Sequence, residues 1–310
     1  MSPASAWKSF GTSPRPTTTS RPLANRAVHG SAFHVSDAPV FPLYFLSYVT
    51  TKPTAAPEIE VRRCSSLEDY DECVRIEHAI WGEDIAVPAG IFVVARHTGG
   101  QAIGAFDGPA MVGFTLALPG LRSGKPFLHS HMTAVLPDYR DRGVGRSLKL
   151  FQRQDALKHG IALVEWTFDP LEIKNAHFNL VRLGAVTRRC LPNYYGITQS
   201  PLHAGLPTDR LLAEWWLDSE RVKSILADSP FPVAGAVERI TLPANIAEIR
   251  SSDTAAAARI QSEARAQFLR AFAKGYAATG IETRAAGAHY ILEPAAGIAG
   301  VRLGEPPGDY

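Results

Sequence analysis

The sequence predicts an α/β protein of the α+β kind, in which a mixed, mostly antiparallel central sheet is flanked by helices. Short apolar runs with a period of two alternate along the chain with segments whose apolar residues recur at helical spacing. A glycine pair, Gly143 and Gly145, stands where one strand gives way to a helix. We expect three sections: a disordered or leader segment (1–57), a core domain (58–218) and a smaller α/β C-terminal extension that packs on the core (219–310).

Composition excludes several classes of protein. The 310 residues are 45% hydrophobic and carry a net charge of +2, so no nucleic-acid partner is expected. No window holds eighteen unbroken apolar residues, so no membrane partner is expected either. The three cysteines (Cys64, Cys73 and Cys190) are too few for a disulfide scaffold and indicate a reducing compartment. A reducing compartment favours a cytoplasmic location. Because no usual zinc spacing occurs, we expect no metal.

Residues 1–57 are rich in proline, serine and threonine, and their only acidic residue is Asp37. Such a stretch buries too little apolar surface to fold by itself. A disordered tail, or translated upstream sequence, is the favoured interpretation, because its prolines break the amphipathic helix that a transit peptide needs. The alternative is an organellar transit peptide, which would place the protein in an organelle. The apolar run 41–49 is too short to span a bilayer.

From residue 58 the pattern becomes regular. A strand is expected from Ile59 to Arg63, then a helix through Trp81 that Ser65 or Ser66 caps, with Glu68 placed for a capping box. A shorter helix follows Pro88. Three extended runs then predict an antiparallel meander, at 101–106, 111–118 and 127–135.

The most informative segment is the turn between the strand that ends at Val135 and the helix that ends at Gly160. Gly143 and Gly145 let the backbone approach a ligand, and the free amides of the first helical turn favour an anion there. Arginines at 140, 142 and 146 add positive charge. The chemistry is that of a pyrophosphate cradle, although the segment matches neither a P-loop nor a dinucleotide fingerprint.

Further elements follow this helix. We expect strands at 163–168, 185–191 and 211–217, and a helix from Asn175 to Gly184 between the first two. The extension begins with a helix at 219–226, extended pieces at 240–242 and 246–249, and a long helix capped by Asp253. An apolar stripe marks that helix, at Ile260, Ala264, Phe268, Phe272 and Tyr276. A last strand is expected at 290–292.

The run Arg140-x-x-Gly143-x-Gly145 after a strand ending in Ala134-Val135 resembles motif A of the GNAT (N-acetyltransferase) superfamily, which binds acyl-coenzyme A. The element order of residues 58–218 resembles that family too. The runs 166–171 and 207–211 and the Asn175 helix look like a subgroup of predicted acetyltransferases with a C-terminal extension, some of which are linked to N-acylation of amino acids, N-succinylation included.

This resemblance implies a GNAT-like sheet and an acyl-CoA-dependent N-acyltransferase. The enzyme would transfer an acetyl or succinyl group to the amine of a small molecule, such as an amino acid, by direct attack in a ternary complex. Acetyl-CoA or another acyl-CoA would be the co-substrate, without a metal. The alternative is a catalytically silent CoA-binding regulatory or structural module. A homodimer formed through the extension is a further expectation.

The resemblance also implies which residues hold the coenzyme. The strand ending at Val135 would pair with the pantetheine arm, and its N–H would face the thioester oxygen. The expected coenzyme-binding residues are Val135, Arg140, Asp141, Arg142, Gly143, Val144, Gly145, Arg146 and Asn175.

Catalytic groups are less clearly marked. Many family members carry a tyrosine, the general acid for the leaving thiolate, where this chain has Leu180. Tyr194 and Tyr195 are alternative candidates, unless they serve only surface packing. His129, His131 and Thr133 alternate and are expected on one strand face. His131 could then act as the base, or it could be a packed histidine.

Three residues are candidates for substrate binding. Glu83 and Asp84 follow the first helix, in the region that lines the acceptor pocket in this family, although a solvated loop would look the same. Arg210 could bind a carboxylate, or could belong to a turn with an internal ion pair within Thr208-Asp209-Arg210. Its competitors for a carboxylate are Arg182, Arg188 and Arg189.

Overall fold

The computed structural model describes residues 58–82, 86–197, 205–229, 231, 237–284, 287–298 and 300. The chain divides into two units, 1–52 and 53–310, and every described residue belongs to the second. The predictions for residues 1–57 and for Glu83 and Asp84 therefore lie outside the described residues. No described helix is both long and apolar enough to cross a membrane.

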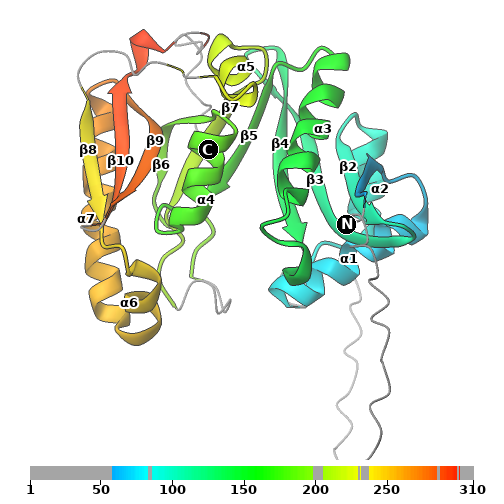
Figure 1. Ribbon diagram of the computed structural model, residues 1–310, viewed down its shortest axis with the longest axis horizontal. Helices are drawn as coiled ribbons and strands as arrows, with labels where there is room; N and C mark the ends of the chain where they lie inside the picture. The colour runs from blue at the N-terminus through cyan, green and yellow to red at the C-terminus, as the bar shows by residue number, and fades with distance from the viewer. Residues whose placement is uncertain are drawn as a thin grey trace, which may run out of the picture. The chain divides into compact units, whose positions relative to one another are not determined.

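The described residues form one mixed sheet, which confirms the predicted fold class (Figure 1). Its order is β1-β2-β3-β4-β5-β7-β6-β9-β10-β8, and all neighbouring strands are antiparallel except β4 and β5. The strands are β1 (Glu60–Arg63), β2 (Gln101–Asp107), β3 (Ala110–Arg122), β4 (Lys125–Val135), β5 (Leu163–Phe168), β6 (Val186–Leu191), β7 (Arg210–Trp216), β8 (Glu238–Leu242), β9 (Tyr276–Arg284) and β10 (Gly287–Pro294).

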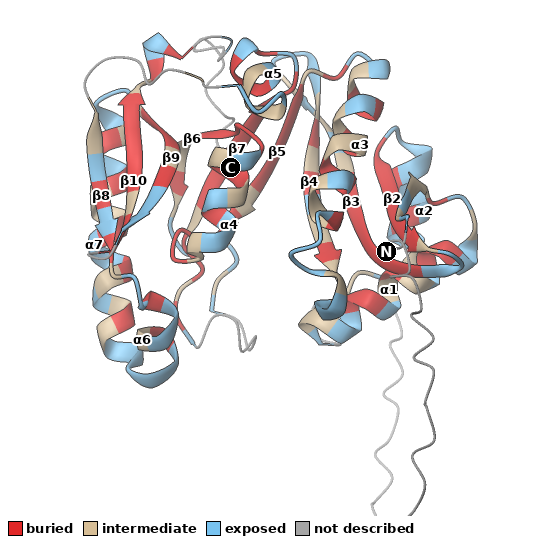
Figure 2. Cartoon of the chain, in the orientation of Figure 1, coloured by how far each residue is buried: buried red, intermediate tan, exposed pale blue. Residues whose placement is uncertain are grey.

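Helices cover both faces of the first four strands. On one face, α1 (Leu67–Trp81) and α2 (Ala89–His97) bury Tyr70 and Phe92 against Phe114 of β3. On the other face, α3 (Val144–Lys158) buries Leu148 against Val112. Between these layers β2 and the first half of β3 are largely buried, whereas β1, β4 and the outward sides of the helices are more exposed (Figure 2). Alternate strand residues therefore serve two cores, as the period of two requires.

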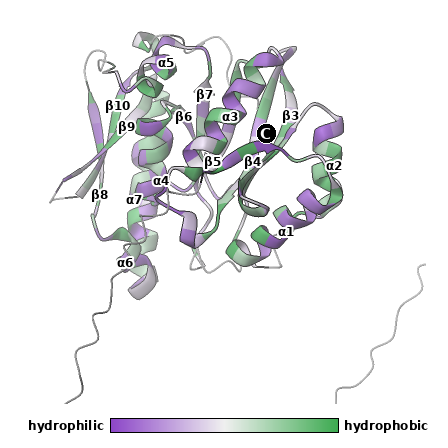
Figure 3. Ribbon diagram, turned by 45° about the vertical axis from the view of Figure 1, so that its right-hand side comes forward, coloured by the Kyte–Doolittle hydropathy of each residue, from purple (hydrophilic) through white to green (hydrophobic). Residues whose placement is uncertain are grey.

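The last third of the chain continues the same sheet. Thr187 of β6 pairs with Ala278 of β9, so β9, β10 and β8 extend the sheet beyond the predicted boundary at residue 218. The helices of this part are α5 (Glu220–Leu226), α6 (Ile246–Ser252) and α7 (Thr254–Ala273). Figure 3 shows that α7 carries both hydrophobic and hydrophilic residues. Its Phe268 packs edge-on against Tyr290 of β10 at 5.0 Å between ring centroids, within one large core cluster.

Several local predictions were wrong. Ser66 caps α1 by accepting from the Asp69 amide, and Asp69, not Glu68, accepts in return from the Ser65 amide. Residues 246–249 are helical rather than extended. Tyr276 begins β9 instead of ending the α7 stripe, because Gly275 adopts a positive φ of 82° that stops the helix. The strand β9 was not predicted, because its alanines have a low strand propensity. Pairing with β10 on one side and β6 on the other stabilises it.

Candidate functional site

The strands β4 and β5 separate beside a β-bulge at His131. Leu116 pairs with Met132 and Ala117 with Ser130, so His131 is the extra residue of β4. The pairing between β4 and β5 is confined to Leu128–Val164 and His129–Glu165. Beyond that point the two strands diverge (Figure 1). Their facing edges, residues 131–135 and 166–168, form no ladder pairs with each other, and we call these two edges together the strand wedge.

The bulge also overturns an expectation. Thr133 pairs with Thr115, and their hydroxyl oxygens lie 2.8 Å apart, whereas His129 pairs with Leu118. Positions 115 and 118 of β3 point to opposite faces, so Thr133 and His129 do as well. The prediction that the alternating residues share one face was wrong, because it assumed a regular strand.

The surroundings of His129 and His131 disfavour the protonated form of both imidazoles. Their ring centroids lie 6.2 Å apart. Burial lowers the pKa of His129 to about 4, with smaller contributions from His131 and Lys149. Desolvation by neighbouring groups lowers the pKa of His131 as well, although the residue keeps an exposed surface. A neutral imidazole can accept a proton.

The glycine turn lies at the open end of the strand wedge. Gly143 is the N-cap of α3 with a φ of 83°, and Asp141 also has a positive φ, of 58°. The first helical hydrogen bond runs from the Ser147 amide to the Gly143 carbonyl at 2.9 Å. The amides of residues 144–146 therefore precede the helical hydrogen bonds and remain available to an anion.

The two glycines have different physical explanations. Gly143 needs its positive φ, a conformation that side chains disfavour. Gly145 is helical, and a Cβ there would meet only the Val135 Cγ2, at 3.9 Å. Neither packing nor backbone conformation explains Gly145, and an interior glycine weakens a helix. The Cβ position of Gly145 thus borders nearly open space at the start of α3.

The predicted arginines fall into two groups. Arg140 and Arg142 are exposed beside the turn; Arg140 Nε donates to the Val135 carbonyl at 3.1 Å. Arg146 is half-buried and donates instead to the Leu226 carbonyl at the end of α5, at 3.2 Å. Val144 is buried in the core, so only its amide can reach a ligand.

Sequence reasoning missed Lys149, which lies on the inner side of α3. The side chain is buried, and its Nζ donates to Ser130 Oγ of β4 at 2.8 Å and to Gln152 Oε1 at 2.9 Å. Nζ also lies 4.1 Å from the ring centroid of Trp166 on β5. The amine thus lies between β4 and β5 at the closed end of the strand wedge, where the pairing of these strands stops. Burial lowers its pKa to about 7. The signal that could have found it is the spacing 149, 152, 156, which places Lys149 on the buried face.

Glu77 is a second buried ionisable group that sequence reasoning missed. It lies on α1 with no exposed surface, and one carboxylate oxygen accepts from the Val87 amide at 2.8 Å. Its other oxygen, Oε1, has no hydrogen-bond partner among the described residues. Burial raises its pKa to about 7. The carboxyl can therefore change its protonation state near neutral pH.

The structure brings Tyr194, Tyr195 and Arg210 together. The tyrosine rings meet edge-on at 4.7 Å, and the Tyr195 hydroxyl lies 2.9 Å from Thr167 Oγ1 at the end of β5. The Arg210 guanidinium lies 5.6 Å from the Tyr195 ring. Thr208 fixes this turn, because its hydroxyl accepts from the Tyr195 amide at 2.8 Å. A phenol and a guanidinium thus face the same end of β5.

The structure also shows the surroundings of the alternative ion pair in the 208–210 triplet and of two competing arginines. Within the 208–210 triplet, Asp209 pairs with Arg265 of α7 at 3.2 Å. Arg188 forms a largely buried pair with Glu214 at 2.6 Å, so its guanidinium is already engaged. Arg182 is exposed.

Asn175 and Leu180 lie on consecutive helical turns. Asn175 is exposed on α4 (Ile173–His177), and its Oδ1 accepts from Asn179 at 3.4 Å. Leu180 belongs to the π-helical turn η3 (Phe178–Arg182) and is fully buried in the main core. The position of the expected tyrosine is therefore filled by core packing.

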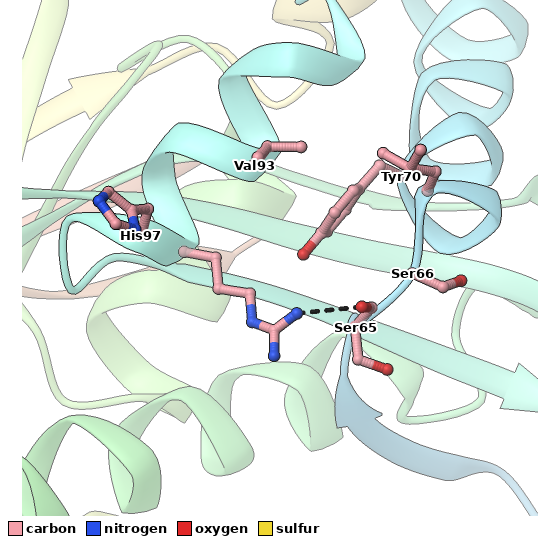
Figure 4. Close-up of a pocket in the computed structure, with 7 residues that line it drawn as sticks. Ser65, Ser66, Tyr70, Val93 and His97 are labelled. Atoms are coloured by element: carbon pink, nitrogen blue, oxygen red, sulfur yellow. Dashed lines mark hydrogen bonds between the residues drawn. The ribbon is translucent and has the colours of Figure 1, made fainter.

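An open pocket lies elsewhere, between the start of α1 and the end of α2 (Figure 4). It is lined in part by Ser65, Tyr70, Val93 and His97, and Arg96 closes one side by donating to the Ser65 carbonyl at 3.0 Å. None of the predicted site residues lines it.

Comparisons with known proteins find similar folds among solved structures. No family model matches the sequence, and a search of curated proteins finds no match. Among solved structures, the chain is similar to the ribosomal-protein-S18-alanine N-acetyltransferase of Escherichia coli (16% identity, 51% of this chain and 92% of that one, TM-score 0.42). It is also similar to a putative acetyltransferase of the GNAT family from Desulfovibrio desulfuricans (15%, 52% and 99%, 0.42) and to the NatC complex bound to Gag peptide and CoA (13%, 51% and 97%, 0.43). The likeness covers about half of this chain, and at such identities it is a likeness of fold alone.

Proposed function

We propose that this protein transfers an acyl group from acyl-CoA to the amine of a small molecule. The observation that carries the proposal is the strand wedge, which opens at the His131 bulge and ends at the glycine turn of α3. An extended polyamide arm can pair with backbone N–H and C=O groups of two diverging strand edges. A pyrophosphate fits the helix start at the open end of the same wedge.

Seven of the nine predicted coenzyme residues have a direct part in this arrangement. The amides of Val144, Gly145 and Arg146 would hold the pyrophosphate, while Arg140 and Arg142 supply exposed positive charge beside it. Backbone groups near Val135 would pair with the arm. Thioesters supply an activated acyl group that a neutral amine can attack. Asn175 is exposed on α4 and would contact the arm.

The acceptor must be neutral when it attacks. His131 is the group we assign to accept its proton, because its lowered pKa keeps the imidazole free at neutral pH. Arg210, beside Tyr195, would bind a carboxylate on an acceptor such as an amino acid. The donor would be acetyl- or succinyl-CoA, with direct attack in a ternary complex.

A second candidate function is a catalytically silent CoA-binding module. Leu180, fully buried where relatives often carry a tyrosine, is the observation that favours it. Binding of CoA would then occur without turnover.

One screen separates the two candidates. Release of free thiol from acetyl- and succinyl-CoA is measured against the amino acids, both enantiomers included, and CoA binding is measured by calorimetry. We expect binding and amine-dependent thiol release. Binding without release for any amine favours the silent module, and absence of binding contradicts both.

A further inference from the structure

Lys149 brings a proton donor to the closed end of the strand wedge. Its Nζ lies between Ser130 of β4 and Trp166 of β5, the strands whose pairing stops at His129 and Glu165. The residue is 3% exposed, so its position is fixed by packing. Its hydrogen-bond acceptors, Ser130 and Gln152, are neutral. No carboxylate of the described residues forms an ion pair with it, so a buried amine stands here without a countercharge.

Acyl transfer from a thioester creates a thiolate, and a thiol has an ordinary pKa of about 8.5. Protonation of the departing sulfur therefore speeds the reaction at neutral pH. Leu180 cannot supply that proton. Lys149 reaches the wedge from α3, on the same sheet face as the turn that would hold the pyrophosphate.

We propose that Lys149 is the general acid that protonates the leaving thiolate; this inference rests on the proposed acyltransferase function. As the acyl C–S bond breaks, its electron pair stays on sulfur, and one Nζ proton of the ammonium moves to that sulfur. Once the thiol has left, the neutral amine of Lys149 regains a proton from water that takes its place beside the strand wedge. The proton of the attacking ammonium leaves separately, through His131.

The surroundings suit a group that must change its charge. The ionisable groups of neighbouring elements are His129 and His131 on β4, Glu165 on β5 with its partner Arg122, and Asp155 on α3 with its partner Arg63 on β1. Both carboxylates are held by arginines, and His129 is neutral at physiological pH. Burial leaves the pKa of Lys149 at about 7, which matches the operating pH of a general acid.

The test compares leaving groups of different acidity. Wild type, Lys149→Met, Lys149→Arg and the control Lys158→Met, an exposed lysine at the end of α3, are assayed with acetyl-CoA and with the acetyl thioester of 4-nitrothiophenol. The second thiol is acidic and leaves without help. We expect Lys149→Met to lose about 10² or more in kcat with acetyl-CoA and only a few-fold with the aryl thioester. Lys149→Arg should behave like Lys149→Met, because its guanidinium is too weak an acid.

Wild type provides a measurement that needs no variant. Its rate with acetyl-CoA should fall as pH rises through the pKa of Lys149, and that fall should be absent with the aryl thioester. Equal losses for both thioesters, or the same alkaline fall for both, would overturn the assignment while leaving the transferase intact. Failure of wild type to transfer acetyl groups to any amine counts against the proposed function itself.

Discussion

The carboxylate of Asp169 lies 2.8 Å from the guanidinium of Arg250, and this nearly buried ion pair ties the turn after β5 to α6, 81 residues later. Arg250 also contacts Glu172, and the Tyr290 hydroxyl donates to the Pro170 carbonyl at 2.7 Å. The last third of the chain thus holds the turn that leads into α4.

The Asp169–Arg250 pair predicts a large stability effect. Arg250→Met should lower the free energy of unfolding by about 3 kcal/mol, because it leaves the Asp169 charge buried without its partner. Adding Asp169→Asn should restore part of the loss. Urea unfolding at pH 7 measures both, with the exposed Arg259→Met of α7 as control. A loss no larger than that of the control would contradict a structural role for the pair.

Substitutions at the two glycines of the turn should distinguish effects on folding stability from effects on CoA affinity. Gly145→Ala is expected to leave the protein as stable or up to about 1 kcal/mol more stable, because alanine favours helix. Its methyl group fills the space above the amide, so CoA affinity should fall about tenfold or more, which is about 1.4 kcal/mol. Calorimetry with CoA and thermal unfolding check the two effects.

Gly143→Ala is the matched comparison. It should cost about 1–2 kcal/mol of stability, because alanine disfavours a φ of 83°. Unchanged CoA binding in Gly145→Ala would remove the case for a pyrophosphate at this turn.

Lys149 predicts a pH-dependent stability. Burial lowers its pKa from 10.5 to about 7, so between these values the unfolded chain binds more protons than the folded one. The free energy of unfolding should therefore rise with pH in this window by about 1.4 kcal/mol per unit. Lys149→Met removes that rise, and its advantage over wild type should shrink between pH 7 and pH 9. Urea unfolding at both pH values checks this, and Lys158→Met should show no such change.

Glu77 predicts the opposite pH dependence of stability: its contribution to the free energy of unfolding should fall as pH rises. Burial raises its pKa from 4.5 to about 7, so in this window the folded chain binds more protons than the unfolded one. Its contribution to stability is present below pH 4.5 and is lost as pH rises through 7. Glu77→Gln should therefore be more stable than wild type by about 1–3 kcal/mol at pH 8 and no more stable at pH 4.5. An equal difference at both pH values would show that Glu77 does not titrate in this window.

Much of the fold follows from local patterns. The strand 163–168 and the helix ending at Trp81 were predicted at their observed limits, because periodicity and caps act within a few residues. Asp253 caps α7 as expected, by accepting from the Ala256 amide at 2.8 Å. The glycine turn was also found from sequence, since its residues are consecutive. By contrast, β9 and the helix at 246–252 depend on partners far away in the chain.

The sequence by itself determined the order of the elements up to β7, the glycine turn and the candidates His131, Tyr195 and Arg210. Only the tertiary structure decided where β4 and β5 part, because a bulge is a mismatch between two strands and has no signature in one of them. It also decided the protonation of Lys149 and Glu77. Burial and the lack of a countercharge set those pKa values, and both arise from residues that are distant in sequence.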